Sequence, residues 1–240
     1  TVYAPTSPAR EGSDEASSAP LFTLQPQTVT ARKRAEDPLQ VPISMSVIDS
    51  AQLEQQRINA VETLLRLTPN VGFSALGDAR STYLSIRGIG PMAQPLGHDD
   101  TSVVIYVDGV PQPLFTADQG LLDIDRAEVM RGPQGTLFGR NAQGGAINFI
   151  TRKPTEATEA EATLEIGSEG YRMGRASLSG ALVPDRLKGR LAFSHNARDG
   201  DVSNLFDSEL GKEGRSAVRG SLIATPDADT TLTLGLFLQR

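Results

Sequence analysis

Apolar and polar residues alternate with a period of two in the last third of the chain. Every second residue between 187 and 193, and again between 231 and 239, is apolar or glycine. Less regular versions of this pattern occur at 160–167, 176–182 and 218–224. A period of two is typical of β-strands, whose successive side chains point to opposite faces of a sheet. The pattern therefore predicts five strands, each with one apolar and one polar face.

The connections between these strands alternate in kind. Pro184-Asp185 and Pro226-Asp227 predict tight turns, whereas Arg198 to Gly214 is a long acidic loop. Strands of about ten residues joined in this way are typical of a transmembrane β-barrel, although a soluble β-sandwich can show the same alternation. Five strands cannot close a barrel wide enough to hold anything, and open edges are not tolerated in lipid. We therefore expect the chain to be the N-terminal part of a larger protein.

The middle of the chain has a different, mixed pattern. A strand is predicted at Ile43 to Ile48, followed by a short helix capped by Asp49 or Ser50. Asn59 and Glu62 have the spacing of a capping box and predict the start of a second helix. Further strands are predicted at Thr82 to Arg87, Ser102 to Val107 and Ala127 to Met130, with a turn at Asp108-Gly109. Together these elements predict an α+β domain.

The N-terminal residues carry little apolar periodicity. Residues 1–26 are rich in Pro, Ser, Ala and Glu and cannot bury enough apolar surface to offset the entropy of ordering, so we expect them to be disordered. Gln27 to Ala31 is a β-prone segment without a neighbouring strand, and the basic Arg32, Lys33 and Arg34 follow it directly.

Composition narrows the function classes. The 240 residues carry a net charge of -6, which does not favour a nucleic-acid groove. The absence of cysteine excludes disulfides and thiolate metal sites, and no run approaches the roughly 18 apolar residues of a membrane-spanning helix. No Ser/His/Asp arrangement or spaced pair of carboxylates indicates catalysis. We therefore expect no enzyme activity, no cofactor and no resident metal.

Glycines are dense in the stretch EVMRGPQGTLFGRNAQGGAINFITRKP, residues 128–154. Such density indicates positive φ or close approach of the backbone to another group. A P-loop is excluded because Gly139 is followed by Arg140 and Asn141 in place of lysine and a hydroxyl residue, and a dinucleotide fingerprint is excluded because Gly144-Gly145 opens a strand. Glycines that merely form turns in a small domain remain an alternative.

This stretch resembles the signature of the plug domain of TonB-dependent outer-membrane receptors, and the segments around it occur in that family's order. The matching segments are QTVTA at 27–31 (the TonB box), VPIS at 41–44, LSIRGIG at 84–90, YVDGV at 106–110, EVMRGPQG at 128–135, FGRN at 138–141 and GGAIN at 144–148. The resemblance covers residues 27–240. It implies a plug seated inside a barrel of about 22 strands, so that the glycine-rich backbone packs within the barrel lumen and approaches the protein wall of the barrel and not phosphate.

The resemblance also implies a domain order and a function. We expect a TonB box region at 27–34, a plug at 35–155 and about the first five strands of a transmembrane β-barrel at 156–240. The protein would be an importer in the outer membrane of a Gram-negative bacterium, taking up a scarce nutrient, most simply a ferric siderophore-like chelate. Its partners would be TonB, outer-membrane lipid and the chelate, and no nucleic acid. The alternative is a soluble periplasmic binding or signalling module built from a plug-like domain.

Three groups of residues are expected to carry this function. TonB would pair with the extended backbone of the box as an added strand, and plug arginines would pair with barrel carboxylates, because an unpaired buried charge is costly. Substrate contacts are expected in loops 88–101 and 113–120. A metal site at His98-Asp99-Asp100 is disfavoured, because three adjacent residues rarely point at one centre. The expected residues are Gln27, Thr28, Val29, Thr30 and Ala31 for TonB; Arg87, Arg131 and Arg140 for the barrel; and Met92, Gln94, His98, Asp99, Asp100 and Phe115 for the substrate.

Overall fold

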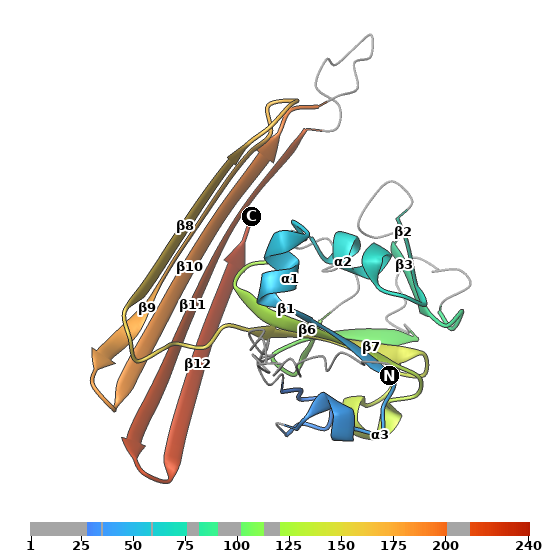
Figure 1. Cartoon of the computed structure of the whole chain (residues 1–240), viewed down its shortest axis with the longest axis horizontal. Coiled ribbons are helices and arrows are strands. Elements are labelled where there is room, and N and C mark those ends of the chain that lie inside the picture. Colours follow the sequence, from blue (N-terminus) through green and yellow to red (C-terminus); the bar gives the residue numbers. More distant parts are fainter. Residues whose placement is uncertain are drawn as a thin grey trace, which may run out of the picture.

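A computed structural model of the chain describes residues 28–34, 36–58, 60–75, 82–90, 102–112, 121–200 and 212–240. The described residues up to Arg152 form an α+β unit, which we call the plug after the resemblance above, and this unit lies beside a sheet of long strands, which we call the wall sheet (Figure 1). No helix among the described residues has the length and apolar character needed to cross a membrane.

The centre of the plug is a five-stranded sheet in the order β1-β6-β7-β4-β5. Strands β4 and β7 are parallel, and the other neighbours are antiparallel. Most residues of β4, β6 and β7 are buried, as expected for strands that are covered on both faces. The strands are β1 (Met45–Asp49), β4 (Val103–Val107), β5 (Val110–Gln112), β6 (Ile124–Arg131) and β7 (Gly145–Thr151).

Helices α1 (Ser50–Gln55) and α2 (Val61–Leu67) cover one face of the plug sheet (Figure 1). The predicted cap of α1 is confirmed, because the Asp49 side chain accepts from the Gln52 backbone in a full capping box. The predicted capping box of α2 is wrong: its N-cap is Ala60 without a side-chain cap, and Asn59 lies outside the described residues. Glu62 instead pairs with Arg66 one turn later, which satisfies its charge on the helix surface.

The other face of the plug sheet is covered by the N-terminal segment, the short 3-10 helix η1 (Pro38–Gln40) and α3 (Gly135–Phe138). Helix α3 lies inside the glycine-rich stretch, where the sequence predicted no helix. The expectation that this stretch approaches the barrel wall is wrong at Gly145, where the close approach is to the plug's own backbone. A Cβ on Gly145 would lie 2.2 Å from the Met130 carbonyl oxygen at φ +151, because β7 pairs with β6 at this point. These glycines therefore allow β7 to pack beside β6.

Two hairpins complete the plug. Asp108 and Gly109 both have positive φ (49° and 79°), as a type I′ turn requires, and they join β4 to β5. This confirms the turn predicted at Asp108-Gly109. The second hairpin pairs β2 (Val71–Ala75) with β3 (Thr82–Ile86).

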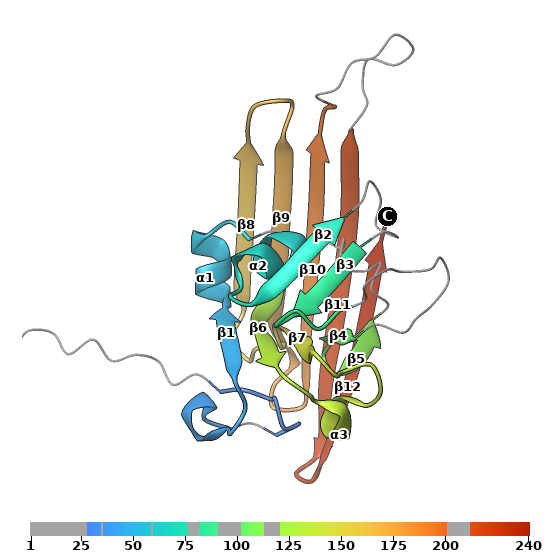
Figure 2. The ribbon, with the colours of Figure 1, turned by 90° about the vertical axis from the view of Figure 1, so that its right-hand side faces the viewer.

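The wall sheet confirms the five strands predicted from the period-two pattern. Its strands are antiparallel and follow chain order: β8 (Glu159–Ile166), β9 (Arg172–Val183), β10 (Leu187–Arg198), β11 (Glu213–Asp227) and β12 (Thr230–Gln239). The second tight turn lies slightly later than expected, because Pro226 and Asp227 still belong to β11. One face of the sheet looks toward the plug (Figure 2). The other face is apolar and exposed, as shown by Leu164 (85%), Ile166 (92%), Leu182 (63%) and Leu234 (67%).

Candidate functional site

Residues 28–31 of the predicted TonB box begin a docked segment, which we define as the described residues 28–34 and 36. Val29 forms an antiparallel bridge with Glu36, through backbone N–H···O distances of 2.8 and 3.0 Å. The side chains of Val29 and Ala31 are fully buried among Met130, Ala146 and other residues on this face of the plug sheet. The β-prone segment therefore has a partner, namely the chain that follows its own turn.

A buried carboxylate holds the docked segment on the plug sheet. Glu128 of β6 is fully buried, and its Oε1 accepts from the backbone N–H of Thr30 at 2.7 Å. The Thr30 hydroxyl lies 3.2 Å from each oxygen of the same carboxylate, and Arg126 Nε donates to Oε1 at 3.0 Å. These contacts give the buried charge the partners that it needs.

The turn of the docked segment carries an ion cluster. Glu36 accepts from Arg32 and from Arg34, with side-chain distances of 2.5–2.8 Å. The hydrogen bonds from Arg32, and then those from Arg34, hold the pKa of the Glu36 carboxyl below its usual value despite some burial. Reciprocally, the hydrogen bond to Glu36 raises the pKa of the Arg32 guanidinium. The segment is therefore held by charge at its turn and by burial at Val29.

Arg87 and Arg131 meet on the plug at one serine. Arg87 Nη2 donates to the Ser44 hydroxyl at 2.8 Å, and Arg131 Nε lies 3.4 Å from the same oxygen. Arg131 also donates to the Ser46 hydroxyl at 2.9 Å and to the Pro69 carbonyl at 3.3 Å. Arg140 is exposed in the turn after α3. The expected contacts of these arginines with barrel carboxylates stay a prediction.

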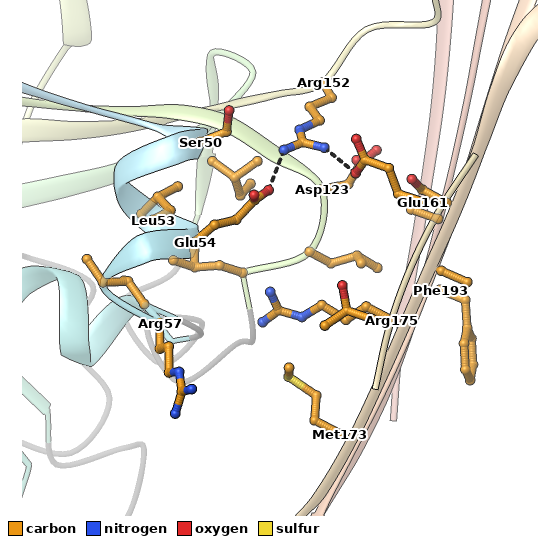
Figure 3. A pocket seen from close by; sticks show the side chains of 18 of the residues that line it. Ser50, Leu53, Glu54, Arg57, Asp123, Arg152, Glu161, Met173, Arg175 and Phe193 are labelled. Atoms are coloured by element: carbon orange, nitrogen blue, oxygen red, sulfur yellow. Dashed lines mark hydrogen bonds and ion pairs between the residues drawn. The ribbon is translucent and has the colours of Figure 1, made fainter. Parts of the chain in front are cut away.

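The plug contacts the wall sheet through charged residues that sequence reasoning missed. Asp123, just before β6, forms a doubly hydrogen-bonded ion pair with Arg190 of β10, at 2.6 and 2.7 Å, and both side chains are 4% exposed. Arg152, just after β7, donates to Glu54 of α1 and to Glu161 of β8, both at 2.7 Å (Figure 3). Burial lowers the pKa of Arg152, but the two carboxylates outweigh it and raise that pKa.

A cavity of about 320 Å³ lies between α1 and the wall sheet, beside these ion pairs. Figure 3 shows Arg152 bridging Glu54 and Glu161 at one end, while Arg175 reaches into the space from β9. Leu53 and Met173 supply apolar surface on opposite sides. The volume is at the lower end of the range for small-molecule sites, and its charged groups face one another across the contact.

Several predicted residues cannot be placed. Gln27 and the expected substrate contacts Met92, Gln94, His98, Asp99, Asp100 and Phe115 lie outside the described residues. Within the described part of the chain, no group of three histidine or acidic side chains is arranged to hold a metal ion.

Comparisons with known proteins identify what this architecture is similar to. Residues 37–146 match the family model described as the TonB-dependent receptor plug domain. The chain is 31% identical over 187 residues to the pesticin receptor of Yersinia pestis, covering 77% of this chain and 27% of that protein. It is 27% identical over 251 residues to the ferrichrome outer membrane transporter/phage receptor of Escherichia coli K12, covering 100% of this chain and 31% of that protein.

A solved structure has a fold similar to that of this chain. The crystal structure of the ferric yersiniabactin uptake receptor from Yersinia pestis superposes with a TM-score of 0.73 at 29% identity, covering 82% of this chain and 31% of that one. The chain therefore spans about a third or less of the length of the proteins that it matches.

Proposed function

Because the chain belongs to the TonB-dependent outer-membrane receptors, we propose that it serves the active import of a ferric chelate of the siderophore kind. The observation that carries this proposal is a plug that contacts the polar face of a sheet whose opposite face is apolar and exposed. Lipid requires an apolar outer face on a closed barrel, and a plug on the inner face controls passage. The chelate class is supported by relatives named for ferrichrome and for ferric yersiniabactin.

The alternative, a soluble periplasmic module, has to cover the apolar face of the wall sheet. Leu232, Leu234, Leu236 and Leu238 are each about 60% exposed or more on that face. Water-exposed leucines in such a row favour association or aggregation. The row therefore supports a membrane-embedded sheet over a soluble one.

TonB would pair with the segment Gln27 to Ala31 as an added strand. Both backbone hydrogen-bonding groups of Val29 are bonded to Glu36, and the amide of Thr30 is bonded to Glu128. TonB can therefore pair with this part of the box only after the docked segment leaves the plug sheet. The proposed cycle begins with that release.

Arg87 and Arg131 would pair with carboxylates of the barrel. Their guanidinium groups share Ser44, so two like charges lie close together, and neither forms an ion pair with an acidic side chain among the described residues. An acidic side chain from a barrel strand would relieve this repulsion. Arg140 is kept as a third candidate. The substrate contacts remain proposed for loops 88–101 and 113–120.

The test is uptake by the full-length receptor in cells that lack their own ferric-chelate receptors. We expect accumulation of radioactive iron from one member of a panel of hydroxamate, catecholate and phenolate chelates, only when TonB is present. Val29→Pro removes the N–H and should abolish uptake while leaving chelate binding intact. Val29→Ala keeps the N–H and should retain more uptake than the proline variant.

Two outcomes would contradict the proposal. Unchanged uptake by Val29→Pro would exclude this segment as the TonB-pairing strand. Recovery of the receptor in the soluble periplasmic fraction, with no uptake of any chelate, would favour the soluble module.

A further inference from the structure

Asp123 and Arg190 form the most deeply buried ion pair between the described parts of the plug and the wall sheet. Two hydrogen bonds join the groups at 2.6 and 2.7 Å, and Arg190 Nη2 also donates to Ser177 at 3.2 Å. Asp123 adopts φ +60, a left-handed conformation that is uncommon for residues other than glycine but is adopted by Asp more readily than by most. The local structure therefore holds this carboxylate in place at some conformational cost.

A second contact lies beside the first. The backbone N–H of Arg152 donates to the Asp123 carbonyl at 2.9 Å, so the start of β6 and the end of β7 are adjacent. From there Arg152 reaches Glu161 on β8, whereas Asp123 reaches Arg190 on β10. Leu122 packs against Ala192 and Ala217 of the wall sheet. One end of the plug sheet is thus fixed to the wall by charges of both signs and by a small apolar contact.

Strand β6 connects this end to the docked segment. Asp123 directly precedes β6, and Glu128, five positions later, holds Thr30. At about 3.4 Å per residue, the two contacts are separated by roughly 17 Å along one strand. Both neighbours of β6 are hydrogen-bonded to it, so it cannot slide independently. Force applied to Thr30 would therefore be borne by the plug sheet as a whole, which meets the wall sheet at the start of β6.

We propose that Asp123 and Arg190 are a positioning pair that keeps this end of the plug fixed while TonB pulls on the docked segment. The inference rests on the proposed function, because it requires a pulling partner. As a consequence, the path for the chelate opens at another part of the plug surface, and the contact at Leu122 stays closed during transport.

The first test reads the contact directly. These 240 residues contain no cysteine. With any cysteine in the rest of the full-length receptor replaced by serine, Leu122→Cys gives a single thiol, at a position that is 4% exposed. We expect a membrane-impermeant maleimide to label it slowly, with or without energised TonB. Adding Arg190→Gln should raise labelling at least roughly tenfold, because an unpaired buried carboxylate destabilises the contact. Lys188→Gln, two residues away on the same face of β10, is the control, because its pair with Glu156 is more exposed.

The second test uses uptake. Asp123→Cys with Arg190→Cys, joined by a short bis-maleimide, should import the chelate at a rate near that of the parent receptor, whereas Arg190→Gln should bind it normally and import it more slowly. Asp123→Arg with Arg190→Asp should restore part of the lost rate.

Three results would overturn the inference: loss of uptake on cross-linking, TonB-dependent labelling of the Leu122→Cys variant that carries no other change, or equal labelling of that variant with and without Arg190→Gln. A parent receptor that imports no chelate would instead contradict the proposed function. The effect of Arg190→Gln on labelling without TonB would still test whether the Asp123–Arg190 pair holds this contact closed.

Discussion

Glu128 places its carboxyl group inside the plug, where three donors surround it. Replacing it with alanine leaves the Thr30 amide without its acceptor and deprives Arg126 of one of its two carboxylate partners. An unsatisfied buried donor costs about 1–3 kcal/mol. We therefore expect Glu128→Ala to open the docked segment about tenfold more often, measured as faster trypsin cleavage after Arg32, Lys33 or Arg34 in the folded receptor.

The matched control for this change is Glu62→Ala, which removes an exposed ion pair with Arg66 on α2. Exposed pairs of this kind contribute little, typically below about 1 kcal/mol. Cleavage of the docked segment should then proceed as in the parent. Equal cleavage rates in Glu128→Ala and the parent would show that the apolar contacts of Val29 and Ala31 alone hold the segment.

Contacts of this kind between individual residues could not be predicted from the sequence. The sequence does place Arg190 among the inward positions of its strand, because the residues on either side of it belong to the apolar face. It carries no signal that Asp123, 67 positions earlier, is the partner. Likewise Glu128 was recognised only as part of a motif, because the contact with Thr30 joins residues 98 positions apart. Ion pairs across such separations depend on the fold and leave no local pattern.

The docked segment is an element whose stability should depend on pH. Arg32 and Arg34 lower the pKa of Glu36, so the folded segment favours the carboxylate. A lowered folded pKa contributes stability above the unfolded value, about 4.3, and that stability is lost as the pH falls through the folded value. We expect amide-exchange protection of the docked segment, corrected for the intrinsic rate, to be full at about pH 7 and to fall below about pH 4.

Glu36→Gln provides the check on that prediction. The variant keeps the backbone bridge to Val29, but its side chain can no longer carry the charge. Protection at neutral pH should drop toward the acid value of the parent, and the remaining pH dependence in this segment should weaken. Protection that matches the parent at every pH would assign the stability of the segment to burial alone.

At the level of elements, sequence prediction succeeded where a pattern repeats over many residues. The strands of the wall sheet have eight to 15 residues, long enough for a period of two to be recognised even in the three strands where it is less regular. It failed for short elements: β5 has three residues and α3 has four, too few for any periodicity to appear. The misplaced start of α2 has a different cause, because the Asn59 and Glu62 spacing also fits a helix that begins one residue later and uses Glu62 for a pair with Arg66.

At the scale of the whole molecule, the wall sheet has a polar side, which faces the plug, and an apolar side, which faces away from it. The side facing the plug carries Arg190, Ser177 and Ser179 among its buried or partly buried residues, whereas the opposite side carries exposed leucines. The register of the strands places leucines of the apolar side next to one another, as Leu178 lies beside Leu191 and Leu222 lies beside Leu234. A shift of one residue would turn every leucine toward the plug.

Because the two sides differ, arginine substitutions at two neighbouring residues of β12 should differ in their effect on the amount of receptor in the outer membrane. Leu234 lies on the apolar face and is 67% exposed, while Thr233 points to the other side. An arginine on the lipid side of a barrel costs roughly 2–4 kcal/mol near the middle of the bilayer. Leu234→Arg should therefore lower the amount of heat-modifiable receptor in the outer membrane several-fold, whereas Thr233→Arg should leave it near the parent level. A gel of heated and unheated outer membranes measures both, and a larger loss for Thr233→Arg would mean that the sheet faces lipid with its other side.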